Sequence, residues 1–209
     1  METVFILTIL VVVFALAFDF INGFHDTANA IATSVSTRAL KPRVAVLMAA
    51  AMNFVGALTF TGVAKTITKD IVDPFALQNG SLIILAALLS AIIWNLVTWY
   101  YGIPSSSSHT LIGSIAGAAV ASSGFAILNW EGFIKIIQAL LISPFLALAV
   151  GFLMMSLFKV IFKNGSLYGT NKKFRIFQIG TAALQSFTHG TNDAQKAMGI
   201  ITMALIAAE

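Results

Sequence analysis

Long apolar stretches, separated by short polar segments, make up most of the chain. A membrane-spanning helix needs about 20 predominantly apolar residues, and several of these stretches reach or exceed that length. The expected segments cover about Val4–Thr33, Val44–Val63, Leu82–Tyr101, Thr110–Leu128, Phe133–Phe162 and Phe174–Ala208. The pattern therefore predicts an all-α integral membrane protein whose helices form a multi-span bundle.

Three polar segments interrupt this apolar pattern. The first stretch is too long for one straight crossing, and Asn22-Gly23 is its expected break. The last stretch is expected to break near His189-Gly190. Residues 102–109 predict a re-entrant loop, because irregular backbone is tolerated at membrane depth only where it is buried in protein or lines a cavity.

Composition supports a membrane protein. Hydrophobic residues make up 58% of the chain and charged residues 10%, whereas charged residues make up about 25% of a typical soluble domain. The chain has no cysteine, which excludes disulfides and thiolate metal sites. The net charge is only +4, and the basic residues lie mainly in short loops, so we expect the lipid bilayer as a partner and no nucleic acid.

The two interrupted stretches carry related motifs. Residues 23–30 and 190–197 share Gly, Asp and Ala at the same offsets, 167 positions apart, and Phe20 matches Phe187 upstream. A charge in hydrocarbon costs at least ~2.5–3.5 kcal/mol, so a repeated acid indicates a polar site. Repeated, glycine-interrupted apolar segments are typical of the binding site of a secondary transporter.

The basic residues predict the orientation of the two motifs. Eight of the twelve lie in two segments: Arg38, Lys41, Arg43, Lys159, Lys163, Lys172, Lys173 and Arg175. The positive-inside rule places both segments in the cytoplasm and the N-terminus outside. The motifs then cross the membrane in opposite directions. We therefore expect a single membrane domain, 1–209, with a first repeat at about 1–128 and an inverted second repeat at about 133–209.

The polar residues within the apolar segments indicate what such a site would bind. Asp19, Asp26 and Asp193 are the acids there, and a low-dielectric site with several carboxylates needs protons or metal cations. The serines after Pro104 would precede or open a helix, either as an ordinary N-cap or as an anion site. With Lys196, these groups favour an oxyanion, and the combination predicts cation-coupled anion symport. An internal polar network that only fixes helix packing is the alternative.

An enzyme is not expected. His109 follows a serine run, but neighbouring residues rarely present their side chains to each other productively, and the chain lacks a Gly-x-Ser-x-Gly elbow. We expect no cofactor other than the coupling cation as a co-substrate.

Three motifs, in order, resemble signatures of the inorganic phosphate transporter (PiT) family, and Trp94–Trp99 is similar to its bacterial low-affinity members. The motifs are residues 23–30, 104–110 and 189–196. The resemblance implies uptake of inorganic phosphate with sodium, protons or a divalent metal across the plasma or inner membrane. It also implies alternating access between two inverted repeats with broken helices.

The resemblance also implies site residues. The coupling cation would be held by Asn22, Asp26, Asn29, Asn192 and Asp193. Phosphate would contact Ser105, Ser106, Ser107, Ser108, Thr110, Asn192 and Gln195. His25, His109 and His189 would respond to protons.

The sequence departs from the family pattern at its end. Family members carry a second serine-rich loop after the second Asp motif, whereas this sequence stops at Glu209. We expect either a fragment or a truncated product, whose partner is a second copy in a homodimer or a polypeptide that completes the second repeat. A permease for sulfate or another oxyanion, and a non-transporting membrane subunit, are the alternative functions.

Overall fold

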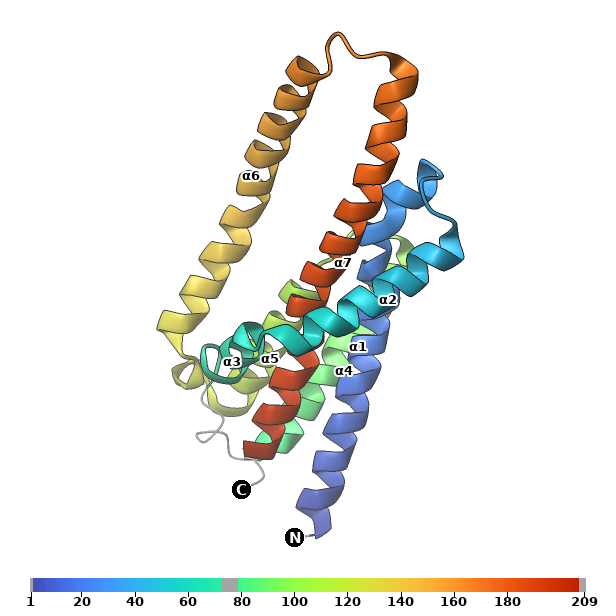
Figure 1. The fold of residues 1–209 in the computed structure, drawn as a ribbon. Helices are drawn as coiled ribbons and strands as arrows, with labels where there is room; N and C mark the ends of the chain where they lie inside the picture. Colours follow the sequence, from blue (N-terminus) through green and yellow to red (C-terminus); the bar gives the residue numbers. More distant parts are fainter. Residues whose placement is uncertain (1, 73–78, 207–209) are drawn as a thin grey trace.

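The computed structural model describes residues 2–72 and 79–206, and these residues form an α-helical bundle (Figure 1). The helices are α1 (Glu2–Ser36), α2 (Pro42–Thr59), α3 (Gly62–Lys69), α4 (Gly80–Tyr101), α5 (Ser107–Ser123), α6 (Trp130–Ile161) and α7 (Leu167–Ile206), with a short 3-10 helix η2 (Phe125–Ile127). By length and composition, α1, α2, α4 and α6 are able to cross a membrane. The predicted all-α membrane fold is confirmed.

The two motif-bearing helices, α1 and α7, pack antiparallel to each other. Asn22 on α1 pairs with Asp193 on α7, and Ser34 pairs with the backbone of Gln178. Residue numbers therefore rise along α1 as they fall along α7, and Figure 1 shows the two helices running in opposite directions. The predicted inversion of the two motifs agrees with this packing.

The predicted breaks at Asn22-Gly23 and His189-Gly190 are wrong, because α1 and α7 are continuous helices of 35 and 40 residues. A glycine inside a helix costs only about 1 kcal/mol relative to alanine. Each backbone group left unsatisfied in a membrane costs several kcal/mol. A continuous helix therefore costs less free energy than a broken one at both motifs.

The break that does occur lies between α2 and α3, inside the second expected segment, Val44–Val63. Phe60 is extended there, and the amide of Gln195 on α7 bonds to the released backbone groups. Its nitrogen donates to the Phe60 carbonyl, and its oxygen accepts from the N–H groups of Val63 at 2.9 Å and Ala64 at 3.3 Å. A single α7 side chain thus replaces helical hydrogen bonds where the chain turns.

Helices α4 and α5 form a hairpin whose turn approaches the middle of α1. Gly102 ends α4 in the left-handed conformation, with φ of 64°, and Ser106 caps α5 by accepting a hydrogen bond from the His109 N–H. Ser107 bonds to Asp26, ten residues before the end of α1, which corresponds to about 15 Å along a helix. The hairpin turns back short of that end, as expected for a re-entrant segment.

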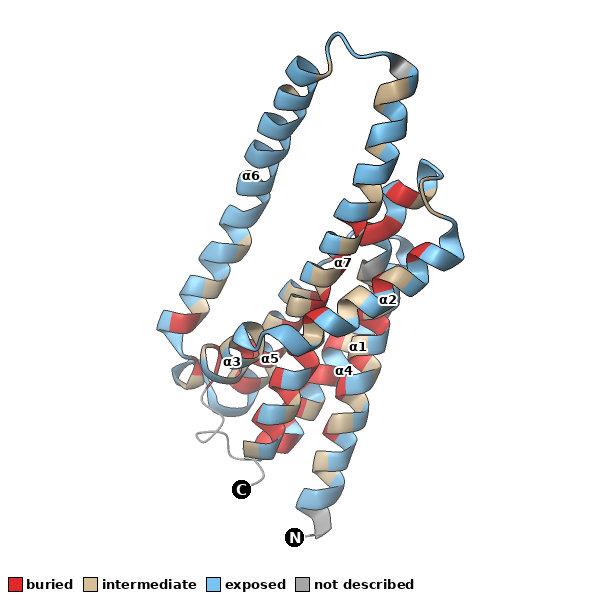
Figure 2. Ribbon diagram, in the orientation of Figure 1, coloured by how far each residue is buried: buried red, intermediate tan, exposed pale blue. Residues whose placement is uncertain are grey.

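The core lies where α1, α4, α5 and α7 meet, whereas α6 stands apart (Figure 2). Phe18, Leu88, Leu111 and Met203 are among its fully buried side chains. Large apolar side chains cover the surface of α6 and are exposed along most of its length. Such a surface suits contact with lipid.

Candidate functional site

The two repeated acids belong to one polar network that joins three helices. Lys196 on α7 lies 3.1 Å from Asp193 and donates to the Ser107 hydroxyl at 2.8 Å. Ser107, at the start of α5, donates to Asp26 on α1 at 2.8 Å. Lys196 is only 3% exposed. Lys196 belongs to the second motif, and its buried ammonium therefore connects that motif to Asp26 of the first motif through one serine.

Further polar groups surround each acid. Asn22 donates to Asp193 at 2.9 Å, and the His189 Nε2 lies 3.2 Å from the same carboxylate oxygen. The other ring nitrogen of His189 is 2.7 Å from the Asn53 side-chain oxygen on α2. On the α1 side, His25 Nδ1 lies 3.0 Å from Asp26. The network thus extends across α1, α2, α5 and α7.

A polar cavity of about 300 Å³ opens on this network. Its walls include Asp26, Asn29, Ser105–Ser108, Gln185, His189, Asp193 and Lys196. The N-terminus of α5 lies at the same cavity, and the first N–H groups of a helix lack intrahelical partners and favour anions. Cationic, hydroxyl and carboxylate groups therefore surround one small space.

Two larger cavities adjoin the polar one. The first, of about 620 Å³, lies between α1, α2 and α7, and His189 and Asp193 line it as well as the polar cavity. Asp19 also lines this space. The second, of about 740 Å³, lies along α4 and α5 and shares Ser105 and Ser106 with the polar cavity. The site is therefore bounded by the His189–Asp193 pair on one side and by the serine turn on the other.

The structure gathers most of the predicted site residues but not all of them. Asp26, Asn29, Asp193, His189 and the four serines line the polar cavity, Asn22 contacts Asp193, and His25 contacts Asp26. The remainder lie elsewhere: Thr110 and His109 line the α4–α5 cavity, Asn192 is exposed and donates to the Thr188 carbonyl, and Gln195 binds the α2–α3 backbone. Helix periodicity explains why Asn192 and Gln195 do not face the polar cavity. Their neighbours Asp193 and Lys196 do, because consecutive residues on α7 point in different directions.

The site includes residues that the predicted set lacks. Asn53 lies outside every motif, and its only signal in the sequence is a lone amide within an apolar segment. Gln185 lies one helical turn before His189 and lines the cavity. Lys196 was expected to favour an oxyanion, but the sequence did not indicate its contact with Ser107.

The ligand chemistry of the cavity suits hard ions. Carboxylate, amide and hydroxyl oxygens are the groups that bind hard cations. Within residues 2–72 and 79–206, no three His, Asp or Glu side chains are grouped as a metal site. The oxygens that line the cavity are those of the Asp26 and Asp193 carboxylates, the Asn29 and Gln185 amides and the serine hydroxyls.

Comparison with known proteins identifies similar sequences. The family model described as "Phosphate transporter family" matches residues 22–168 and 163–209. A "Probable low-affinity inorganic phosphate transporter" of Bacillus subtilis (strain 168) is 73% identical over 208 residues. A protein of the same description from Mycobacterium leprae (strain TN) is 48% identical over 202 residues. Both relatives are described as transporters.

The chain spans part of the length of these relatives. All of it aligns with the Bacillus protein, of which it covers 62%, and 96% of it aligns with the Mycobacterium protein, of which it covers 48%. A solved structure described as "The sodium-dependent phosphate transporter" matches with a TM-score of 0.80 at 23% identity, covering 97% of this chain and 68% of that one. This likeness supports the fold.

Proposed function

The chain belongs to the phosphate transporter family, and from this premise we propose that it takes part in cation-coupled transport of inorganic phosphate. The observation that carries the proposal is the polar cavity, where Lys196 and the N-terminus of α5 lie beside two carboxylates. The ammonium, the serine hydroxyls and the free N–H groups suit a phosphate oxyanion.

The charge of the site supports coupling to a cation. With Asp26 and Asp193 ionised and the histidines neutral, the two carboxylates outweigh the single ammonium of Lys196. An anion entering this cavity meets a net negative charge, which disfavours it in a low dielectric. One or more cations bound with phosphate remove that penalty. Asp26, Asp193, Asn22 and Asn29 are the proposed cation ligands, and Ser105–Ser108 with Lys196 are the proposed phosphate ligands.

Alternating access is the proposed mechanism. The antiparallel relation of α1 and α7 supports it, because transporters built from inverted repeats bind substrate at the repeat interface. The His189–Asp193 pair separates the polar cavity from the α1–α2–α7 cavity. A shift of this pair would connect the two spaces. We propose repeats of about 1–128 and 133–209 within the chain.

Uptake of labelled phosphate into proteoliposomes tests the proposal. We expect uptake that depends on an imposed gradient of sodium, protons or magnesium phosphate, each applied separately, and that excess sulfate does not suppress. Empty liposomes and the Asp193→Asn variant are the controls. Uptake that sulfate suppresses and unlabelled phosphate does not would overturn phosphate as the substrate. Uptake unchanged by every cation gradient would overturn coupling.

A further inference from the structure

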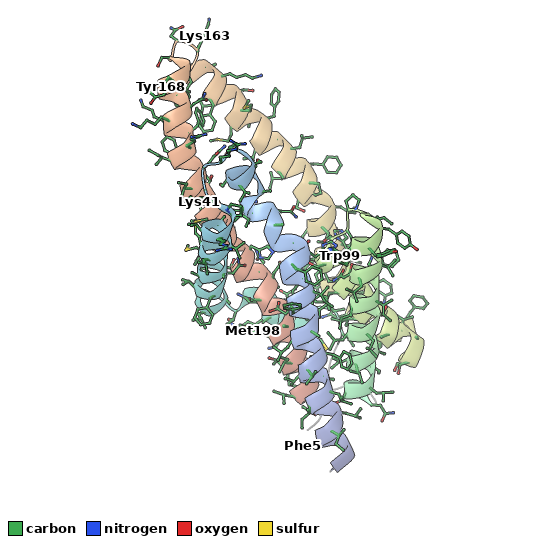
Figure 3. All side chains as sticks on the ribbon, turned by 90° about the vertical axis from the view of Figure 1, so that its right-hand side faces the viewer. Phe5, Lys41, Trp99, Lys163, Tyr168 and Met198 are labelled. Atoms are coloured by element: carbon green, nitrogen blue, oxygen red, sulfur yellow. The ribbon has the colours of Figure 1, made fainter. Side chains whose placement is uncertain are left out.

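The α1–α2 and α6–α7 turns, and the residues next to them, carry a cluster of positive charge. No acidic residue is close to either turn in the sequence. Eight basic residues lie there, and the chain has no Asp or Glu at positions 27–69 or 132–192. Figure 3 shows Lys163 and Tyr168 at the α6–α7 turn, with Lys41 lower down in the same half of the molecule. This charge is available to an external anion.

A cavity of about 570 Å³, here called the basic cavity, lies beside the start of α7. Its walls include Lys172, Arg175, Thr37 and Tyr168. Arg175 donates to the Thr37 carbonyl at 3.3 Å, which directs its guanidinium across the gap between α7 and the end of α1. The Thr37 hydroxyl donates to Gln178 at 2.7 Å. Two cationic side chains thus line a space that has polar walls fixed by hydrogen bonds.

An apolar cavity of about 400 Å³ adjoins the basic cavity. Phe174 and Gln178 line both, and the remaining walls of the apolar cavity are Phe158, Ile161, Phe162, Phe177 and Thr181. The Phe174 ring lies 5.7 Å from Phe158 and 5.0 Å from Phe162, between centroids. Rings from α6 and α7 meet near the turn and form the wall of this cavity.

We propose that these joined cavities bind one anionic phospholipid, with its phosphate at Lys172 and Arg175 and an acyl chain along the phenylalanines. Charge complementarity supports a headgroup phosphate, since basic pockets between membrane helices bind anionic headgroups. The apolar extension favours a lipid over free phosphate, because burying each methylene of an acyl chain is favourable. Aromatic side chains also gather at membrane interfaces.

The bound lipid would fill space between the two helices of the α6–α7 hairpin. Helices α6 and α7 stay apart below their turn (Figure 1), and an acyl chain would pack against both. This proposal does not depend on phosphate transport, because its site lies at the α6–α7 turn and contains none of the proposed transport residues.

Lipid retention tests the proposal. The full chain is placed in nanodiscs of equal phosphatidylglycerol and phosphatidylcholine, extracted, and its retained lipid is measured by native mass spectrometry. We expect phosphatidylglycerol to be retained preferentially. Lys172→Gln should lower the retained ratio about fivefold, the effect of one interfacial charge. The matched control is Lys163→Gln, an exposed lysine at the turn that does not line the cavity, and it should leave the ratio unchanged.

Two further measurements decide whether the cavities bind a lipid or a free anion. Phe177→Ala should reduce retention, whereas Phe145→Ala, an exposed phenylalanine of α6 outside the cavity, should not. Millimolar inorganic phosphate should fail to displace the lipid. Equal losses in Lys172→Gln and Lys163→Gln would overturn the proposal in favour of diffuse surface charge. Displacement by inorganic phosphate would overturn it in favour of a free-anion site. None of these readouts depends on uptake.

Discussion

At the scale of single residues, Lys196 is the group on which the site depends. Among the described residues that line the polar cavity, it is the one that carries an ammonium group, and it contacts both Asp193 and Ser107. We expect Lys196→Gln to reduce phosphate uptake at least tenfold, because hydrogen bonds to charged groups contribute about 1.5–3 kcal/mol and each 1.4 kcal/mol is a factor of ten. Labelled-phosphate uptake, normalised to the amount of inserted protein, measures the loss.

The matched control for Lys196 is Lys65→Gln, because Lys65 is an exposed lysine on α3 away from the cavity. Its uptake should equal that of the native chain. If Lys196→Gln transports phosphate as fast as Lys65→Gln, the ammonium is not a phosphate ligand.

The two repeated acids make a second prediction at this scale. Asp26→Asn and Asp193→Asn should each abolish coupled uptake, because each removes a negative charge that a coupling cation would neutralise. Both variants should insert normally, since asparagine has nearly the same shape and still accepts from Ser107 or Asn22. Gradient-driven uptake and membrane fractionation are the measurements. Normal uptake in either variant would refute the role of that carboxylate.

At the scale of elements, the site is positioned by the close contact of α2 with α7. A Cβ added at Gly56 on α2 would lie 2.2 Å from the Phe187 carbonyl oxygen, which is too close for any side chain. We expect Gly56→Ala to destabilise the protein by about 1–3 kcal/mol, as overpacking does. The thermal unfolding midpoint in detergent should fall by several degrees.

Gly180 provides the control for Gly56, since it also lies in a packed helix but has open space where a Cβ would be. Gly180→Ala should hold or raise the midpoint, because alanine favours a helix over glycine. A midpoint for Gly56→Ala at or above that of Gly180→Ala would show that α2 and α7 are not in this close contact.

The arrangement of α1 and α7 could be predicted from the sequence, whereas the break between α2 and α3 could not. Loop charges predicted the antiparallel motifs because topology follows residues local to each loop. The α2–α3 break was missed because its stabilising partner, Gln195, lies more than 130 positions away. The same residue was expected to bind phosphate. A motif indicates which residue types are present, but the packing of α7 against α3 decides which of them face the cavity.

At the scale of the whole molecule, the asymmetric charge predicts how the bundle sits in the membrane. Helix α6 has 32 residues and is about 48 Å long at 1.5 Å per residue, which exceeds the roughly 30 Å hydrocarbon core. Glu131 lies in its first turn and Lys163 just after its end, and both are exposed. A spanning α6 therefore places these two residues on opposite sides.

The chain has no cysteine, so single-cysteine variants report each side separately. In intact cells, a membrane-impermeant maleimide should label Glu131→Cys, whereas Lys163→Cys should react only after permeabilisation. The physical reason is the basic end, whose eight cations favour the cytoplasmic side. A labelled Lys163→Cys with a protected Glu131→Cys would invert the orientation, and labelling of both in intact cells would show that α6 does not span the membrane.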